Sequence, residues 1–380
     1  MDFSLSDEER AIRDTARDFI RKEIMVLEPE VLRRERDHRP ALERSAVVEL
    51  QQKAKSFGFW GLSTPEADGG MNLPAVMQAL IAAELGRTFV PFSFGGEADN
   101  ILYFCNTDQR KEYLEPTISG ERRSCFAITE PGAGSDLASL RTSALLDGDE
   151  YVVNGQKVWT SYADKADWIF CLVRTDAAAP KHLGISFLLF DMASPGVSTS
   201  PIKLISGYSP FCQTFFDDVR VPRANLMGTA GKGWDIAKYL LTHEREMIGD
   251  LDDGRRSLSQ IAVKALGEAG VAPLRSDIVR HEINALAFGL TMERVKDETK
   301  AGQGTGALSS MLKYYGTELN KQRQELLMSV GGSDSLAWSG TGEVDTSRHW
   351  LRSRANSIEG GTSEVQLNII AKRVLQLPGA

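Results

Sequence analysis

The chain has 380 residues, of which 42% are hydrophobic and 25% charged, the balance of an ordinary globular protein with two or three structural units. Fifty-two Asp and Glu residues against forty-four Lys and Arg residues give a formal charge of −8 and a pI near 5.4. Nucleic-acid binding requires a clustered basic surface, so this balance argues against a polyanionic partner.

The sequence also argues against membrane insertion, a secretory leader and a metal site. The longest apolar runs, 168–173 and 185–190, are too short to cross a bilayer, and the start MDFSLSDEER lacks the basic-then-apolar order of a signal peptide. No His pairs with a Cys or another His at ligand spacing, so we expect no metal. The four cysteines lack CxxC spacing, which favours free, mostly buried thiols in a reducing compartment. We therefore expect a cytoplasmic protein.

Helical spacing dominates the first stretch of the chain. Ser6 is placed to cap a helix whose apolar residues recur from Ile12 to Ile20. Two further helical runs cover about 42–57 and 74–85. We expect residues 1–121 to form a helical amino-terminal domain.

From about residue 124 the period changes to that of strands. Short segments rich in β-branched and aromatic residues alternate with turn signals, among them the tight-turn dipeptides Asp147-Gly148 and Asn154-Gly155. The expected strands are 125–129, 143–146, 151–154, 156–160, 168–173, 185–190 and 214–220. No long helical pattern interrupts them, so a parallel βαβ sheet is disfavoured. No GxGxxG follows a strand, which removes the usual dinucleotide-binding fingerprint. We expect a small barrel or sandwich over residues 122–230.

After Pro222 the helices return. The expected helices are 233–244, 255–269, 277–301, 306–330 and 362–375. Long amphipathic helices with short connections favour a bundle, here over residues 231–380. Pattern alone thus predicts an α+β chain in which a β-domain separates two helical regions.

Three segments are more informative than their hydrophobic pattern, because their sequences are specific. They are CFAITEPGAGSD at 125–136, YVVNGQKVWTSYADKADW at 151–168 and IEGGTSEVQLNIIAKRVLQL at 358–377. Together with FFDDVRVPRANLMG at 215–228, they resemble the signature segments of the acyl-CoA dehydrogenase family over essentially the whole chain. The resemblance implies a helical amino-terminal domain, a central β-barrel and a carboxy-terminal four-helix bundle, with FAD held between barrel and bundle.

The implied activity is the α,β-desaturation of an acyl-CoA thioester to a trans-2-enoyl-CoA, with electrons passed to an electron-transfer flavoprotein. FAD brings the redox chemistry, and the protein supplies geometry and electrostatics. The resemblance also implies a tetramer. The acyl-chain identity is not readable from the sequence.

The resemblance assigns flavin contacts to two strands. Phe126, Ile128 and Thr129 match the strand whose backbone and hydroxyl meet the isoalloxazine edge. Trp159 and Ser161 match the second strand, where the indole lies beside the ring and the hydroxyl reaches N5. An extended strand suits this task because alternate residues face one side. From the residues alone, the alternative is that Trp159 is an aromatic residue of the barrel core.

Further contacts are implied at a loop, a glycine pair and a turn. Thr362 and Glu364 match residues that meet FAD from a helix amino terminus, where backbone N–H groups are ready donors. Gly331 and Gly332 resemble the pair that packs against the adenine half of an FAD bound by a neighbouring subunit. Ser135 matches a residue that contacts the pantetheine arm of CoA, and otherwise reads as a simple turn serine.

Desaturation requires a carboxylate that takes the α-proton in a dry pocket. Many family members place this Glu directly before the GT of the carboxy-terminal loop, where this chain has Gly360; Glu359 is one residue too early. Other relatives carry the base on a bundle helix in a Glu-Arg pair, which here is Glu244-Arg245. We expect Glu244 to be the base and Arg245 to meet the CoA moiety. The alternative is that both belong to a charged helix face.

The sequence departs from the family pattern at two places. In relatives, both belong to the part of the FAD site that one subunit contributes to its neighbour. Relatives carry an Arg-x-x-Phe-Gly segment whose Arg reaches the FAD pyrophosphate; the stretch 265–282 lacks it, and neither Arg275 nor Arg280 is assignable to that role. Met328 stands where relatives often have Gln. Such asymmetry resembles heteromeric acyl-CoA dehydrogenases acting on steroid side chains, in which two chains share each flavin. Divergence within a homotetramer explains the departures equally well.

Two other functions remain open. One is a partner subunit of a heteromeric acyl-CoA dehydrogenase that binds little or no flavin, which the missing Arg supports and the intact TEPGAGSD segment opposes. The other is a flavin oxidase or monooxygenase on the same scaffold, because a fold does not determine one chemistry.

Overall fold

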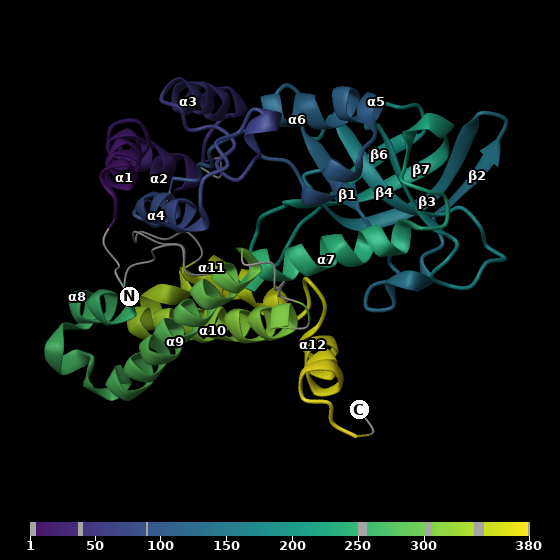
Figure 1. The fold of residues 1–380 in the computed structure, drawn as a ribbon. Helices are drawn as coiled ribbons and strands as arrows, with labels where there is room; N and C mark the ends of the chain where they lie inside the picture. The colour runs from purple at the N-terminus through teal and green to yellow at the C-terminus, as the bar shows by residue number, and fades with distance from the viewer. Residues whose placement is uncertain are drawn as a thin grey trace. The chain divides into compact units, whose positions relative to one another are not determined.

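The computed structural model describes residues 5–36, 41–88, 90–249, 257–300, 306, 308–337 and 346–378 (Figure 1). The chain divides into two compact units, one formed by Gly96–Glu244 and the other by Met1–Gly95 together with Arg245–Ala380. Within the described stretches, no helix combines the length and apolar content needed to cross a membrane.

The amino-terminal segment is helical, as the sequence predicts. Its helices are α1 (Asp7–Phe19), α2 (Glu28–Arg36), α3 (Arg44–Ser56) and α4 (Ala75–Leu85). Ser6 caps α1 through a capping box, because its Oγ accepts from the Glu9 N–H at 3.2 Å while the Glu9 carboxylate accepts from the Ser6 N–H at 2.8 Å. A core that includes Phe19, Ile24 and Ile81 holds these helices together.

Eight strands form one sheet in the second unit. They are β1 (Ser124–Ala127), β2 (Ser143–Asp147), β3 (Glu150–Ser161), β4 (Trp168–Arg174), β5 (Ile185–Asp191), β6 (Val197–Ile202), β7 (Phe211–Pro222) and β8 (Leu226–Met227). The order is β6-β7-β3-β2-β4-β5-β8, and β1 pairs with β4. β1 and β4 are labelled side by side in Figure 1. Only the β1–β4 and β2–β4 pairs are parallel. The β-rich middle region predicted from the sequence is therefore confirmed.

The expected tight turn at Asn154-Gly155 is wrong. Both residues lie inside β3, which pairs with β7 along its length and shifts register between Val153 and Gly155. Gly155 has a φ of 148°, and a Cβ there would lie 2.7 Å from the Cα of Thr142. Gly155 thus allows β3 to pass close to the backbone of Thr142. The two strands expected over 151–154 and 156–160 are one strand.

Helices also pack on the sheet within this unit. They are the 3₁₀ turn Asn100–Phe104, α5 (Thr107–Gln109), the π-helical turn Arg110–Leu114, α6 (Glu115–Ser119) and the first part of α7 (Gly233–Gly249). Ile101 and Leu114 share a buried core with Trp168 and Phe170 of β4. Packing therefore places residues 96–121 with the strands, and the boundaries 1–121, 122–230 and 231–380 stay a prediction.

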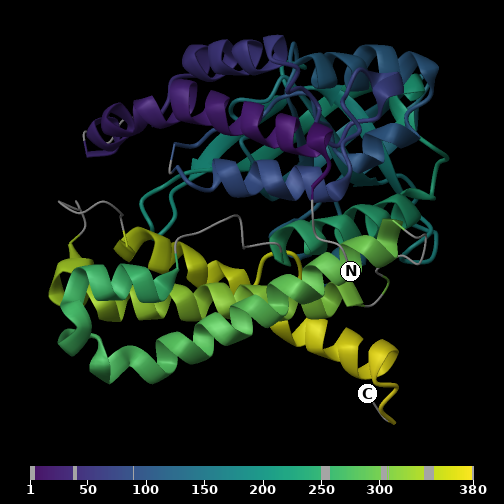
Figure 2. The ribbon, with the colours of Figure 1, turned by 60° about the vertical axis from the view of Figure 1, so that its left-hand side comes forward.

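The carboxy-terminal region is helical, as expected. Its helices are α8 (Leu258–Gly270), α9 (Arg275–Lys300), α10 (Leu308–Gly331), α11 (Thr346–Ser353) and α12 (Ser363–Ile369), the last continued by a π-helical turn over Ile370–Val374. α10 contacts α8, α9, α11 and α12, and its run beside α9 is visible in Figure 2. α8 bends at Gly267, where φ is 70° and ψ is 169°.

Candidate active site

A buried ion pair joins two of the signature segments. The Lys157 side chain is fully buried in β3, and its Nζ donates to Glu130 Oε1 at 2.9 Å and to the Ile128 carbonyl at 3.0 Å. Glu130 also accepts from the backbone N–H groups of Arg141 at 2.7 Å and Thr142 at 2.8 Å. Burial acts to raise the pKa of Glu130, but Lys157 and these donors outweigh it and hold that pKa below its usual value.

The end of β1 is fastened to β3 at consecutive carbonyls. The Ile128 carbonyl accepts from Lys157, and the Thr129 carbonyl accepts from the Val158 N–H at 2.9 Å. Phe126, on β1 itself, stacks on Phe170 with ring centroids 5.5 Å apart. The structure therefore brings three residues expected at the flavin, Phe126, Ile128 and Thr129, next to the strand that carries Trp159.

Trp159 lies where β3 shifts register against β7, between Lys157 and Thr160. Its φ is 65°, which is uncommon for a residue with a Cβ, and its indole is 52% exposed. The indole contacts Phe211 edge-on at 5.9 Å, and Ser161 pairs with Phe211 in the ladder. An irregularity of this kind re-aims a side chain, so Trp159 is presented at the surface of its unit and is not a core aromatic.

Ser135 lies in the Gly-rich turn that follows β1, and it is exposed. The turn begins where the backbones of Glu130 and Ala133 exchange hydrogen bonds of 3.2 and 3.1 Å. At its far end Lys181 Nζ lies 2.7 Å from Asp136 Oδ1, and this bond lowers the pKa of Asp136. The turn thus presents the Ser135 hydroxyl to solvent from a fixed backbone.

The GGTSE loop leads into α12. Thr362 caps that helix, because its Oγ1 accepts from the Val365 N–H at 3.2 Å. Gln366 is fully buried, its Nε2 donates to the Gly360 carbonyl at 3.0 Å, and a Cβ on Gly361 would lie 2.5 Å from that Nε2. Glu364 is exposed in the first turn, where backbone N–H donation and the Thr362 hydroxyl lower its pKa.

Two oxygens beside this loop lack partners. Within the described residues, Ser363 Oγ and Gln366 Oε1 are buried and have no hydrogen-bond partner. Buried polar atoms are nearly always paired in proteins, so these two atoms suit a polar ligand at this helix amino terminus. Gly332 lies at the end of α10 with a φ of 55°, a conformation that favours glycine.

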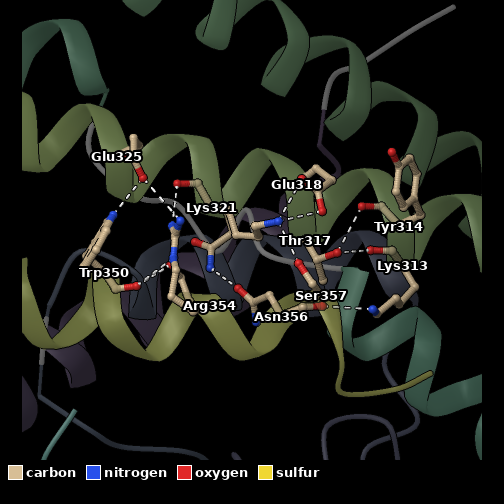
Figure 3. Close-up of polar contacts among 12 residues, drawn as sticks. Lys313, Tyr314, Thr317, Glu318, Lys321, Glu325, Trp350, Arg354, Asn356 and Ser357 are labelled. Carbon is tan, nitrogen blue, oxygen red and sulfur yellow. Dashed lines mark hydrogen bonds and ion pairs between the residues drawn. The ribbon is translucent and has the colours of Figure 1, made fainter. Parts of the chain in front are cut away.

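A cluster of charged and amide groups ties the loop to α10 (Figure 3). Lys313 is fully buried and donates from Nζ to the Asn356 carbonyl at 2.9 Å. Lys321 Nζ contacts Glu318 Oε1 at 2.9 Å and Ser357 Oγ at 2.7 Å. Burial lowers the pKa of Lys313, although nearby carboxylates oppose that effect. These contacts set the path of the backbone that precedes Gly360.

The Glu359 carboxylate belongs to the same cluster. Its Oε2 accepts from Arg352 at 2.7 Å, and its Oε1 accepts from the Asn356 side-chain amide. A carboxylate held in two such bonds is oriented by its partners, which opposes use as a mobile base. These contacts agree with the prediction that Glu359 is not the catalytic base.

Comparison with known proteins settles the family. Models of the amino-terminal, middle and carboxy-terminal domains of acyl-CoA dehydrogenases match residues 6–121, 125–219 and 231–375. The acyl-CoA dehydrogenase IpdE1 of Mycobacterium tuberculosis is 34% identical over 355 residues, or 90% of each chain. The chain is an acyl-CoA dehydrogenase.

Other relatives and solved structures agree. FadE29 of Mycobacterium tuberculosis, also an acyl-CoA dehydrogenase, is 32% identical and aligns over 84% of this chain and 86% of its own. The ChsE4-ChsE5 complex of Mycobacterium tuberculosis superimposes with a TM-score of 0.79 at 27% identity over all of both chains. The Tcur3481-Tcur3483 steroid ACAD has a TM-score of 0.81 at 27% identity, again over all of both chains. The predicted α+β family fold is confirmed.

All the site residues assigned to this acyl-CoA dehydrogenase stay predictions. Glu244 and Arg245 lie on α7, but their side chains fall outside the described residues. Arg275 pairs with Glu268 at 3.4 Å and Arg280 with Asp277 at 3.6 Å, all exposed. Neither arginine is therefore marked out by the structure as the missing pyrophosphate ligand.

Sequence reasoning missed Glu130 and Lys157. Both lie inside the quoted signature segments, as the Glu of TEPGAGSD and the Lys of NGQK. A charged residue in such a segment is either exposed or part of a buried ion pair, and only its neighbours in the folded structure distinguish the two cases. The four cysteines, Cys105, Cys125, Cys171 and Cys212, are free and buried, as expected.

Proposed function

We propose that this acyl-CoA dehydrogenase uses FAD to desaturate an acyl-CoA thioester to a trans-2-enoyl-CoA, and passes the electrons to an electron-transfer flavoprotein. The observation that carries the proposal is the presentation of Trp159 on a register shift of β3, beside a β1 end that Lys157 and Val158 hold in place. Bound FAD supplies the hydride acceptor, and the chain supplies position and charge.

The residues present suit the flavin. An exposed indole and an ordered strand end suit an aromatic ring with a polar edge, and we assign Phe126, Ile128, Thr129, Trp159 and Ser161 to that task. The helix amino terminus capped by Thr362, with the unpartnered oxygens of Ser363 and Gln366 and the exposed Glu364, suits polar groups. We also assign Gly332, whose positive φ favours glycine, as a backbone position that admits close approach.

The chain's own chemical step is a proton transfer. We assign Glu244 as the carboxylate that removes the α-proton, with Arg245 and Ser135 binding the CoA portion. Gly360 carries no side chain for this role, and Glu359 is committed to Arg352 and Asn356. An isolated carboxylate in a dry site becomes a stronger base, which the reaction requires.

We propose that the enzyme works as a homo- or heterotetramer in the cytoplasm. The exposed face of α9 carries Val279, Ile283, Leu286 and Leu290 at 46, 61, 66 and 64% exposure. Spacings of four, three and four residues place these side chains on one helical stripe, which favours burial against another acyl-CoA dehydrogenase chain. The free buried cysteines suit a reducing compartment.

The second candidate is a subunit that shares its flavin with a different chain. Two similar solved structures are named for pairs of chains, ChsE4-ChsE5 and Tcur3481-Tcur3483, and the latter is a steroid ACAD. In this chain, Met328 stands at the usual Gln position, and Arg275 and Arg280 are held in salt bridges. Both features favour weaker binding of the FAD of a neighbouring subunit. A bulky, steroid-like acyl group is then the substrate class to test first.

The visible spectrum of the purified protein tests these proposals. We expect a flavin spectrum that bleaches anaerobically when one acyl-CoA of a panel, including steroid-side-chain thioesters, is added. Flavin that appears only when a second acyl-CoA dehydrogenase chain is co-expressed supports the shared-flavin candidate. Absence of flavin under both conditions would overturn the FAD assignment.

A further inference from the structure

Lys157 contacts one peptide group at the end of β1, the strand that we expect to meet the flavin. Its Nζ donates to the Ile128 carbonyl at 3.0 Å, and that carbonyl shares its peptide plane with the Thr129 N–H. The neighbouring carbonyl, that of Thr129, is held separately by the Val158 N–H at 2.9 Å. The orientation of this peptide group is therefore determined by β3 and not by β1 alone.

The Lys157 charge acts in a dry environment. The side chain has no exposed surface, so its field is weakly screened compared with that of a surface lysine. A hydrogen bond to a carbonyl polarises the peptide group and strengthens the N–H at its other end as a donor. An ammonium donor makes this effect larger than a neutral donor would.

Glu130 holds the ammonium in place. Its Oε1 accepts from Lys157 at 2.9 Å, while the Arg141 and Thr142 N–H groups, at 2.7 and 2.8 Å, orient the carboxylate. The two backbone donors come from the segment after the Gly-rich turn and lie on neither β1 nor β3. Glu130 is thus anchored independently of the strands that Lys157 joins.

We propose that Lys157, held by Glu130, is a positioning residue that orients and polarises the Ile128–Thr129 peptide group toward the isoalloxazine edge of bound FAD. The inference rests on the proposed FAD dependence. A strengthened donor at that edge favours the more electron-rich form of the flavin, and so raises its midpoint potential. A purely structural ion pair would affect stability and leave the potential unchanged.

The experiment compares three variants of the full chain, expressed with its partner chain if one is required. Lys157→Met removes the ammonium, and Lys157→Met/Glu130→Gln removes both charges so that no unpaired buried carboxylate remains. Gln109→Met is the matched control, because buried Gln109 donates to the Ala224 and Leu226 carbonyls, each at 2.8 Å, in the same unit. The readouts are Tm, the FAD dissociation constant and the midpoint potential of the bound flavin.

We expect Gln109→Met to lower Tm without changing either flavin property. The double variant should regain Tm relative to Lys157→Met, yet still bind FAD at least tenfold more weakly and at a more negative potential than the unaltered chain. A double variant with unchanged FAD affinity and potential would overturn the inference while leaving FAD dependence intact. Failure of the unaltered chain to bind flavin would instead overturn the proposed function, and the inference with it.

Discussion

Trp159 combines two features that a packing role does not explain, a φ of 65° and an indole that is 52% exposed. A positive φ destabilises a residue with a Cβ by about 1–3 kcal/mol. Because the ring is half exposed, its burial offsets little of that cost. The retention of a large apolar group in such a position agrees with the proposed contact to a ligand. We assign that ligand as the flavin.

Trp159→Ala should therefore separate stability from binding. Because the indole is half exposed, the free energy of unfolding of the flavin-free protein should change by less than about 1 kcal/mol. The FAD dissociation constant should rise, or the visible spectrum should shift, since the ring contact is lost. Thermal unfolding and flavin titration measure the two. Unchanged flavin affinity and unchanged turnover would place the indole outside the flavin site.

Glu244→Gln tests the assignment of the base. The amide preserves shape but accepts no proton, so flavin reduction by substrate should slow by roughly 10²–10⁴, as general-base catalysis typically contributes. Substrate affinity should change little, because the neutral amide does not repel the thioester. Stopped-flow reduction and substrate titration give both quantities.

Glu359→Gln is the comparison variant. It loses the charge opposite Arg352 and should lower Tm slightly while leaving flavin reduction nearly intact. If Glu359→Gln abolishes reduction and Glu244→Gln does not, the base lies on the carboxy-terminal loop. The α7 assignment would then be wrong.

At the scale of elements, β3 is the strand on which the second unit is organised. It pairs with β2 and β7, it contributes Lys157 and Val158 to the end of β1, and it carries Trp159 at a register shift. The buried pair between Lys157 and Glu130 stabilises this arrangement only while both groups are charged, since an unpaired buried charge is costly. The strength of the β1–β3 connection should therefore depend on pH.

Acid should weaken that connection in a predictable direction. The folded protein holds the pKa of Glu130 below the usual 4.5, so the unfolded chain binds a proton more readily. The stabilisation from Glu130 is then complete above about pH 4.5 and is lost as the pH falls through the folded value. Glu130→Gln should cost about 3–5 kcal/mol at pH 7 and progressively less below pH 4.5. Urea unfolding at a series of pH values measures the difference.

Asp136→Asn provides the matched control in the same signature segment. Asp136 also pairs with a lysine, Lys181, but both side chains are exposed, at 64 and 46%. Solvent screens such a pair, so the substitution should change the unfolding free energy only slightly at every pH. A pH profile for Glu130→Gln that runs parallel to the profile of the unaltered chain would refute the linkage argument.

At the scale of the whole molecule, the exposed stripe on α9 is the feature that a single chain leaves unexplained. Four large aliphatic side chains in one row are unfavourable in water, and burial against a second chain removes that cost. Closed symmetric assemblies are the common way in which such a surface is buried. The bundle helices thus favour an oligomer, whichever chains compose it.

Leu286→Glu/Leu290→Glu should shift the mass of the complex in solution toward smaller species. The two carboxylates would face a buried apolar partner surface, at a cost of several kcal/mol. Light scattering after gel filtration gives the mass. Val48→Glu/Phe57→Glu, on exposed residues of the amino-terminal region, should leave the mass unchanged. A monomer with full flavin occupancy before any substitution would contradict the shared-site argument.

The sequence by itself determined the features that depend on local interactions. The capping box at Ser6 and the 3.6-residue period of α1 are short-range, so they are legible along the chain. The change to strand character near residue 124 is equally local. The signature segments then identified the family, and with it the residue types expected at a flavin.

Only the tertiary structure decided what depends on partners distant in the chain. Pairing with β7 kept residues 150–161 in one strand although Asn154-Gly155 favours a turn, because ladder hydrogen bonds outweighed the local preference. β6 was missed since Val197–Ile202 alternates weakly and gains its order from β7. Lys157 and Glu130 lie 27 residues apart, and their burial as a pair is a property of the sheet, not of either segment. Strand pairing and burial depend on contacts between residues far apart in the chain, so no short stretch of sequence predicts them.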